Sequence, residues 1–329
     1  MKLGIALPQV GHFADPRVTR SIAMQAEASG FDSLWVFDRI LAPVEPQNPY
    51  PASADGMLPE SHSVVLDPLL CLTLAASVTT SIRLGTSVLV APWYSPVLLS
   101  RSLTTLDRIS NGRVDAGLGI GWSIDEYESV GVAASGLGAR LDEQLDVLSS
   151  TQRDAVVELR TSRERIARCT IEPKPIQQHI PLLLAAYTPH GFARIGRRAD
   201  GWMAAGLPLE VMESMWQAII ESARSNSRDT GALRFVVRAN VKLTPSSLGD
   251  DRPIFMGSLD QIRDDIKRTA GIGATELVLD VQDTCTSVTQ MTNLISALTE
   301  RVWRGESAGA SSSSSNDRYF LASMNPCAV

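Results

Sequence analysis

Eight short runs rich in Val, Leu and Ile alternate with longer segments of helical periodicity, and this alternation constrains the fold more than any other feature. It is typical of parallel strands joined by crossover helices. The expected strands are Leu3–Leu7, Ser33–Phe37, Ile82–Val90, Arg113–Ile120, Pro181–Ala186, Asp200–Ala205, Arg234–Leu243 and Thr275–Val281. Their number predicts an α/β fold of the (β/α)8 TIM barrel type.

The helices expected between these strands include Pro16–Ser29, Pro68–Thr79, Pro96–Ile109 and Leu259–Ala270. Three of them begin with proline, where its missing N–H costs least. In a barrel of this kind the functional groups gather at the C-terminal ends of the strands and in the loops that follow. We therefore expect the site at that end.

The chain is predicted to hold one barrel domain over residues 1–305. Residues 41–63 are too long for a simple connection, and such proline-containing loops are commonly lids or binding segments. Residues 150–179 form a polar, Arg-rich insertion that we expect to be irregular, and the serine-rich stretch 306–329 reads as a flexible tail.

Composition limits the partners. A net charge of -6 with no cluster of Lys and Arg argues against nucleic acid or an anionic membrane and favours a small-molecule substrate. The 4 cysteines are far apart with no CxxC pair, which favours reduced thiols in a cytoplasmic protein over disulfides or zinc. The chain shows no secretory signal and no apolar run long enough to span a membrane. It also lacks HExxH and GxSxG motifs, so we expect no metal site and no serine hydrolase.

The stretch DRISNGRVDAGLGIGW, residues 107–122, carries alternating glycines after an expected strand. A dinucleotide-binding turn needs its third glycine three residues after the second, at the start of a helix. Here Gly121 follows Gly119 after two residues, and Trp122 comes next. The spacing excludes that kind of phosphate cradle, so the glycines need another explanation.

Several stretches resemble the luciferase-like oxidoreductases, and within them the branch that uses coenzyme F420. They include MKLGIALPQVG, AEASGFDSLWVFDR, NPYPASADGMLPE, the long run from LDPLLC to GLGIGW, RADGWM and GSLDQIRDDIKRTAGIGATELVLD. They cover most of residues 1–300 in the right order. The resemblance implies a (β/α)8 barrel that binds F420, with FMN as the alternative cofactor.

The resemblance also implies where the cofactor would lie. Gly119 and Gly121, before Trp122, would let a flat ring approach the backbone, although glycines in a barrel strand can also simply relieve crowding. A non-proline cis peptide is implied at Ser87–Val88. The cofactor's phosphate would lie near Ala185, Ala186, Tyr187 and Thr188, where Thr188 and the proline after it predict a helix start with free N–H groups.

The main departure from the family pattern is Arg39, which follows Asp38 where relatives commonly have a histidine acid or base. Arginine stays protonated and cannot relay a proton, but it can hold a carboxylate or stabilise negative charge. A glutamate position after the fourth strand is taken by Trp122. Candidate proton donors are Tyr94, His12, Tyr50 and solvent, while the other histidines, His62 among them, are expected to be surface or capping residues.

The loss of a base favours reduction, because oxidation of an alcohol requires one. The predicted function is an F420H2-dependent reductase that transfers a hydride to an electron-poor C=C or C=N bond of a small, specialised metabolite. The alternatives are an FMN-dependent monooxygenase that uses oxygen and a non-catalytic barrel that only binds a flavin or has lost its site. By resemblance to the family, a homodimer is expected.

Overall fold

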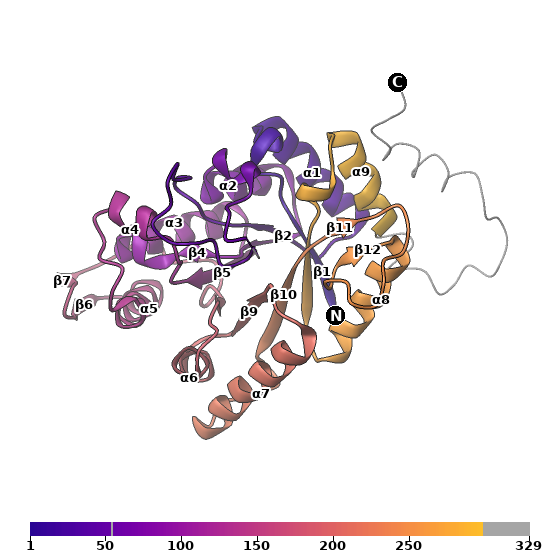
Figure 1. Ribbon diagram of the computed structural model, residues 1–329. Helices are drawn as coiled ribbons and strands as arrows, with labels where there is room; N and C mark the ends of the chain where they lie inside the picture. Colours follow the sequence, from indigo (N-terminus) through magenta and orange to yellow (C-terminus); the bar gives the residue numbers. More distant parts are fainter. Residues whose placement is uncertain (54, 299–329) are drawn as a thin grey trace.

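A computed structural model describes residues 1–53 and 55–298, and its strands close into a parallel barrel (Figure 1). The neighbours run β3-β2-β1-β13-β10-β9-β8-β5, and β5 pairs back onto β3. The strands are β1 (Lys2–Ala6), β2 (Ser33–Val36), β3 (Arg83–Thr86), β5 (Val114–Gly119), β8 (Leu182–Leu184), β9 (Gly201–Ala205), β10 (Arg234–Asn240) and β13 (Glu276–Asp280). Each predicted strand is present, so the predicted (β/α)8 barrel is confirmed.

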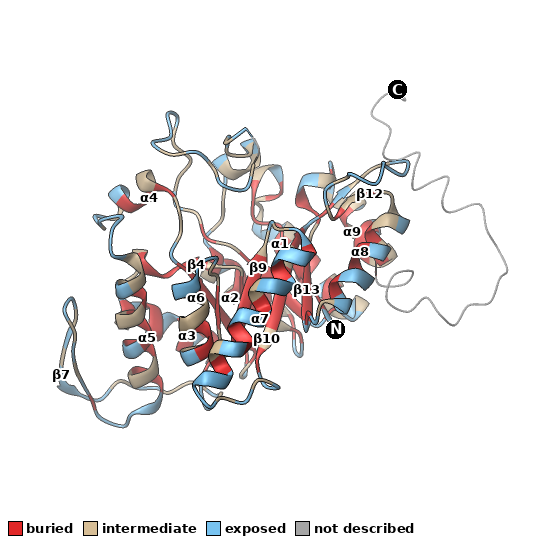
Figure 2. Cartoon of the chain, turned by 60° about the horizontal axis from the view of Figure 1, so that its bottom comes forward, coloured by how far each residue is buried: buried red, intermediate tan, exposed pale blue. Residues whose placement is uncertain are grey.

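Helices surround the barrel and bury their inner faces against it (Figure 2). They are α1 (Pro16–Ser29), α2 (Pro68–Val78), α3 (Pro96–Ile109), α4 (Ile124–Ser129), α5 (Leu137–Arg153), α6 (Pro189–Arg198), α7 (Leu209–Ser225), α8 (Leu259–Gly271) and α9 (Val288–Ala297). Proline occupies the first turn of α1, α2 and α3, as predicted, and the Asp15 and Asp67 side chains cap α1 and α2. Local sequence therefore places these helix starts correctly.

Trp35 fills the inside of the barrel together with Leu183, Met203, Val236 and Val278. Glycines on the neighbouring strands make room for it: a Cβ atom at position 85 would lie 2.3 Å from the indole ring. Burial of a side chain of this size contributes strongly to stability, and the indole N–H donates to Ser33. The inside of the barrel is thus packed with side chains.

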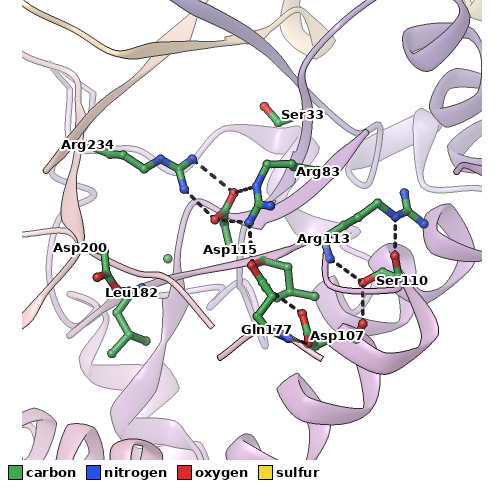
Figure 3. A network of polar contacts seen from close by, with 12 residues as sticks. Ser33, Arg83, Asp107, Ser110, Arg113, Asp115, Gln177, Leu182, Asp200 and Arg234 are labelled. Atoms are coloured by element: carbon green, nitrogen blue, oxygen red, sulfur yellow. Dashed lines mark hydrogen bonds and ion pairs between the residues drawn. The ribbon is translucent and has the colours of Figure 1, made fainter. Parts of the chain in front are cut away.

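A buried polar network closes the N-terminal end of the strands (Figure 3). Asp115 is fully buried and accepts hydrogen bonds from Arg83 at 2.7 Å and from Arg234 at 2.6 Å. Arg234 also reaches Glu276 at 2.9 Å. Burial would raise the pKa of Asp115, but the two guanidinium groups hold it below its ordinary value. This network occupies the end of the barrel where residues usually serve stability.

The insertion 150–179 is more regular than predicted. Its first residues belong to α5, and the antiparallel hairpin β6 (Val157–Arg160) and β7 (Arg165–Cys169) follows, beside α5 in Figure 1. Apolar Val157, Leu159 and Ile166 alternate with polar residues, a period of two that specifies strands. The high arginine content concealed this period.

Other expectations meet the structure as follows. Cys71, Cys169 and Cys285 are free thiols, whereas Cys327 lies outside the described residues. The predicted tail, 306–329, also lies outside them. Within the described part of the chain, no helix is long and apolar enough to cross a bilayer. In the same residues no group of three or more His, Cys, Asp or Glu side chains could hold a metal ion.

Candidate functional site

The site is organised around an irregularity at the end of β3. The Ser87–Val88 peptide is cis, as the family resemblance implied, and β4 (Leu89–Val90) continues beyond it along β5. The Ser87 N–H donates to the Val36 carbonyl at 2.6 Å, and the Val88 carbonyl accepts from the Asp38 N–H at 3.2 Å. The ends of β2 and β3 are therefore fixed to each other.

The glycines of β5 accommodate this irregularity. A Cβ atom at Gly117 would lie 1.7 Å from the Thr86 carbonyl oxygen, and one at Gly119 would lie 2.8 Å from the Val88 side chain. Gly121 has φ 67°, which favours glycine. Relief of crowding, the alternative stated above, explains these positions without a ligand. The same packing brings the side chains of Val88 and Ala185 to Gly119, and both also pack on the cluster inside the barrel.

Buried Asp38 and half-buried Tyr94 form a hydrogen-bonded pair. The Tyr94 hydroxyl donates to the Asp38 carboxylate at 2.8 Å, and the Val90 N–H donates to the same oxygen at 3.1 Å. Burial raises the pKa of Asp38 to about 6, although both hydrogen bonds oppose this shift. Burial and the neighbouring carboxylate also raise the pKa of Tyr94. Tyr94 is thus a protonated donor held against a carboxylate that titrates near neutral pH.

Arg39 is buried and already has a partner. Its guanidinium lies 3.5 Å from Glu126 of α4, with side-chain exposures of 5% and 2%, and it stacks over Trp122 at 5.2 Å. Glu126 also accepts from the Ile40 N–H at 2.9 Å. Burial raises the pKa of Glu126 despite the attraction of Arg39. The Arg39 Nε atom is buried with no hydrogen-bond partner.

Glu126 was missed by the sequence argument, which considered only position 122 for a carboxylate. The preceding Ser123 caps α4 and Glu126 is its third residue, the pattern of a capping box. The structure instead directs the Glu126 carboxylate to Ile40 and Arg39. A local helix-start pattern thus concealed a residue of the site.

The loop 41–63 brings a row of aromatic rings over this end of the barrel. His62 packs against Phe37 with ring centroids 5.0 Å apart, and Tyr50 lies 6.0 Å from His62 and 5.3 Å from Trp122. The Asn48 side chain attaches the loop to the start of α4, because it accepts from the Ile124 N–H at 2.9 Å and donates to the Trp122 carbonyl at 3.0 Å. We call Phe37, His62, Tyr50 and Trp122 the aromatic row.

The expected surface or capping role of His62 is therefore corrected. Its Nδ1 atom is buried and has no hydrogen-bond partner. Burial and the charges of Arg39 and Arg238 lower the pKa of His62 to about 4, so the ring is neutral at pH 7. The histidine lies in a polar loop sequence, ESHS, which contains no signal of burial.

Arg238, at the end of β10, was also missed. It donates to the Ser87 hydroxyl at 2.7 Å, pairs with Asp280 of β13 and lies 5.2 Å from the Phe37 ring. In the sequence, Arg238 is one polar residue in a strand whose apolar and polar residues alternate, so nothing marks it as a site residue. Only barrel closure brings these strand ends to the cis peptide.

The remaining predicted positions are more dispersed. His12 is exposed on the turn η1 (Gly11–Phe13) and packs on Phe13 at 3.8 Å. Thr188 caps α6, as predicted, by accepting from the Gly191 N–H at 3.2 Å. Tyr187 binds the Ala205 backbone through its hydroxyl, and the Ala186 carbonyl accepts from Trp202 at 3.0 Å. The start of α6 at Thr188 is present as predicted. That it binds the phosphate of a cofactor stays a prediction.

Comparisons with known proteins agree with this architecture. A family model described as luciferase-like monooxygenase matches residues 1–248. An uncharacterized protein of Mycobacterium tuberculosis is 31% identical over 281 residues, which cover 82% of this chain and 89% of that protein. The F420-dependent glucose-6-phosphate dehydrogenase of Kineococcus radiotolerans is 26% identical over 66% of this chain and 61% of its own length. The crystal structure of a monooxygenase from Streptomyces bottropensis superposes with a TM-score of 0.77 at 19% identity, covering 94% of this chain and 100% of that one.

Proposed function

The chain belongs to the luciferase-like monooxygenase family and is an oxidoreductase, and from this premise we propose that it is a reductase dependent on reduced coenzyme F420. Its substrate would be a small molecule with an electron-poor C=C or C=N bond. The relative from Kineococcus radiotolerans supports the deazaflavin, since its name gives F420 as its cofactor. The observation that carries the proposal is the hydrogen-bonded Asp38–Tyr94 pair beside an arginine in place of a base.

The residues present fit such a cofactor. Val88, Gly119 and Ala185 lie together at the C-terminal ends of their strands, and none carries a side chain larger than valine that would keep a flat ring away. The capped start of α6, after Thr188, offers backbone N–H groups to an anion. When bound, the reduced deazaflavin supplies a hydride and reacts poorly with oxygen.

The contacts of the two carboxylates in the site, Asp38 and Glu126, favour reduction over oxidation. Oxidation of an alcohol requires a base that takes the hydroxyl proton. Arg39 cannot serve, and Glu126 is occupied by Arg39 and the Ile40 N–H. Asp38 already accepts two hydrogen bonds, one of them from Tyr94. This arrangement supports a proton donor more than a base, and therefore reduction.

In the proposed reaction, individual residues of the site have different roles. The Arg39 guanidinium holds a carbonyl or anionic end of the substrate. Tyr94 donates the proton that completes the reduction while a protonated Asp38 returns one to the Tyr94 oxygen, and solvent then reprotonates Asp38, whose pKa is raised to about 6. The aromatic row and its loop exclude water from this end of the barrel.

Cofactor titration tests the proposal. Purified protein is titrated with F420 and, separately, with FMN, and oxidation of F420H2 is followed under anaerobic conditions with a panel of conjugated ketones and imines. We expect micromolar binding of F420 and turnover that falls in Tyr94→Phe, which keeps the ring and removes the proton. Oxygen uptake coupled to substrate hydroxylation with FMN would contradict the proposal. Binding of neither cofactor would identify a non-catalytic barrel.

A homodimer and a substrate from specialised metabolism belong to the same proposal. The second is supported by the departures at Arg39 and Trp122 from the family pattern, which do not suit a sugar-phosphate dehydrogenase. Sedimentation of the purified chain tests the first, and a sedimenting monomer would contradict it.

A further inference from the structure

The loop 41–63 lies across the mouth of the barrel between two anchored ends. At the first end, the Ile40 N–H donates to the Glu126 carboxylate at 2.9 Å. At the second end, the Val64 carbonyl accepts from the Gly11 N–H at 2.8 Å. Every backbone–backbone hydrogen bond of the described residues of the loop stays inside the loop. Between its ends, this described part is therefore held to the barrel by side-chain contacts.

The polar contacts of the loop with α4 are few and lie near the surface. Asn48 accepts from the Ile124 N–H at 2.9 Å and donates to the Trp122 carbonyl at 3.0 Å. The Gln47 amide donates to Glu128 at 2.8 Å in an exposed position. Hydrogen bonds of this kind are individually weak, because water replaces them when they break. The loop can therefore separate from α4 without disturbing any strand of the barrel.

The His62 ring joins the loop to the aromatic row and fits there only when it is neutral. Phe37 lies against it with ring centroids 5.0 Å apart, and Tyr50 meets it at an interplanar angle of 72°. An imidazolium carries a proton on both ring nitrogens, and the Nδ1 atom of His62 is buried with no partner among the described residues. Burial and the charges of Arg39 and Arg238 lower the pKa of His62 to about 4. A protonated ring is therefore disfavoured in this position.

Other titratable groups surround the same turn, η2 (Glu60–Ser63). Asp280 favours the imidazolium but is already paired with Arg238. Asp283 accepts from the Ser61 hydroxyl at 3.4 Å, and burial raises the pKa of Asp283, as it does that of Glu126. A carboxyl group with a raised pKa favours the closed position as the pH falls, which is the opposite of the effect of His62. The remaining groups are Tyr50, whose pKa is also raised, and the exposed Glu60 and His12.

We propose that the loop 41–63 is a lid that opens about Ile40 and Val64, and that protonation of the His62 imidazole opens it. The charged ring leaves the aromatic row for water and takes the loop with it. Opening uncovers the C-terminal end of the barrel, where the Asp38–Tyr94 pair lies. The proposal goes beyond the proposed reaction and does not depend on it.

The size of the effect follows from the two states of His62. Its pKa is about 4 in the closed position, against an ordinary value of 6.5 in water. Because the pKa is lowered in the closed position, closure is fully favoured above pH 6.5 and is lost as the pH falls toward 4. From about pH 7.5 to about pH 5.5, His62 alone raises the ratio of open to closed lid about tenfold.

Distances between two spin labels measure the opening in the full-length protein without cofactor. One label is attached at Val44→Cys, because this side chain of the lid is 99% exposed. The other is attached at Ser102→Cys, an exposed position on α3. Cys169→Ser and Cys327→Ser remove the other two sites that could be labelled, and the two buried thiols stay. Pulsed electron spin resonance at both pH values then gives the ratio of the two distance populations.

Three variants give the expected pattern. His62→Phe keeps an aromatic ring that cannot be protonated, so the pH-dependent rise in the open population should be about tenfold larger in wild type. His12→Phe is the matched control, since it removes an exposed imidazole from the neighbouring turn, and it should behave as wild type. Asn48→Ala removes both Asn48 contacts with the start of α4 and should increase the open population at both pH values.

A single distance in Asn48→Ala at about pH 5.5 would overturn the lid. An equal pH response in wild type and His62→Phe would overturn the role of His62. If His62→Phe does not fold, nuclear magnetic resonance of the wild-type histidines decides, with His62 assigned by substituting the other three. His62 must gain its proton over the same pH range in which the lid opens, and a proton gained with the lid closed contradicts the proposal. Because no cofactor is present, these results do not depend on whether F420 binds.

Discussion

Replacing Arg39 by methionine should destabilise the protein chiefly through the carboxylate that it leaves behind. At the 3.5 Å separation of Arg39 and Glu126, two charges attract with about 5 kcal/mol at an effective dielectric constant of about 20. Desolvation offsets most of that gain, because burial raises the pKa of Glu126 even with the arginine present. Removing one partner of a buried pair typically costs about 3–5 kcal/mol. We expect a loss of this size in the free energy of unfolding.

Glu126→Gln provides the matched comparison. Glutamine keeps an acceptor for the Ile40 N–H, and Arg39 keeps its position over Trp122. Arg39 loses its counter-charge in this variant, but its guanidinium keeps the Trp122 face and the Leu41 carbonyl, so Glu126→Gln should lose less stability than Arg39→Met. The double variant, which leaves neither charge, should return to within about 1 kcal/mol of wild type. Urea unfolding of the four proteins gives the coupling energy directly.

The pH dependence of stability tests independently whether the unpaired Glu126 carboxylate causes the loss in Arg39→Met. A carboxyl group whose folded pKa is raised favours the protonated folded state, so its penalty disappears as pH falls through that pKa. The deficit of Arg39→Met should therefore shrink as the pH is lowered, while Glu126→Gln should not show this trend. If the double variant is as unstable as Arg39→Met at every pH, the reasoning from an orphaned carboxylate is refuted.

Three further predictions test the site and its support. Because folding raises the pKa of Asp38 from 3.8 to about 6, the free energy of unfolding should fall by about 3 kcal/mol as the pH rises from about 4 to 6. Asp38→Asn should abolish this pH dependence in urea unfolding, and an unchanged pH dependence would show that another group causes it. Gly117→Ala should fail to fold or lose more than about 3 kcal/mol, since its Cβ would meet the Thr86 carbonyl; Gly249→Ala, with open space around it, is the control for thermal melting. Asp115→Asn should cost about 3–5 kcal/mol by removing a fully buried carboxylate that two half-buried guanidinium groups share, and melting within experimental error of wild type would refute that role.

Steady-state kinetics measure the role of Arg39 in catalysis separately from its effect on stability. If its guanidinium holds the substrate, Arg39→Met should lower kcat/KM by a factor equivalent to about 2–4 kcal/mol, mainly through KM. Glu126→Gln keeps the guanidinium and should lose much less. Equal kcat/KM in wild type and Arg39→Met would reject the substrate contact, whatever the stability measurements show.

The sequence alone determined the barrel, because each step of that inference is local. Apolar runs of strand length, helical periods between them and prolines at helix starts depend on neighbours along the chain. The helix start at Thr188 follows from the same kind of local chemistry and is present. The cis peptide at Ser87–Val88 came from resemblance to a family, since composition and spacing contain no trace of it.

Only the tertiary structure decided how the site is assembled. Asp38 meets Tyr94, Arg39 meets Glu126, and Arg238 reaches Ser87 across 151 positions of sequence. These contacts exist because a closed sheet brings the C-terminal ends of all its strands to one rim, whatever their separation along the chain. Burial is a property of that rim and not of a residue type, so the raised pKa of Asp38 and the neutral state of His62 could not be read from the sequence.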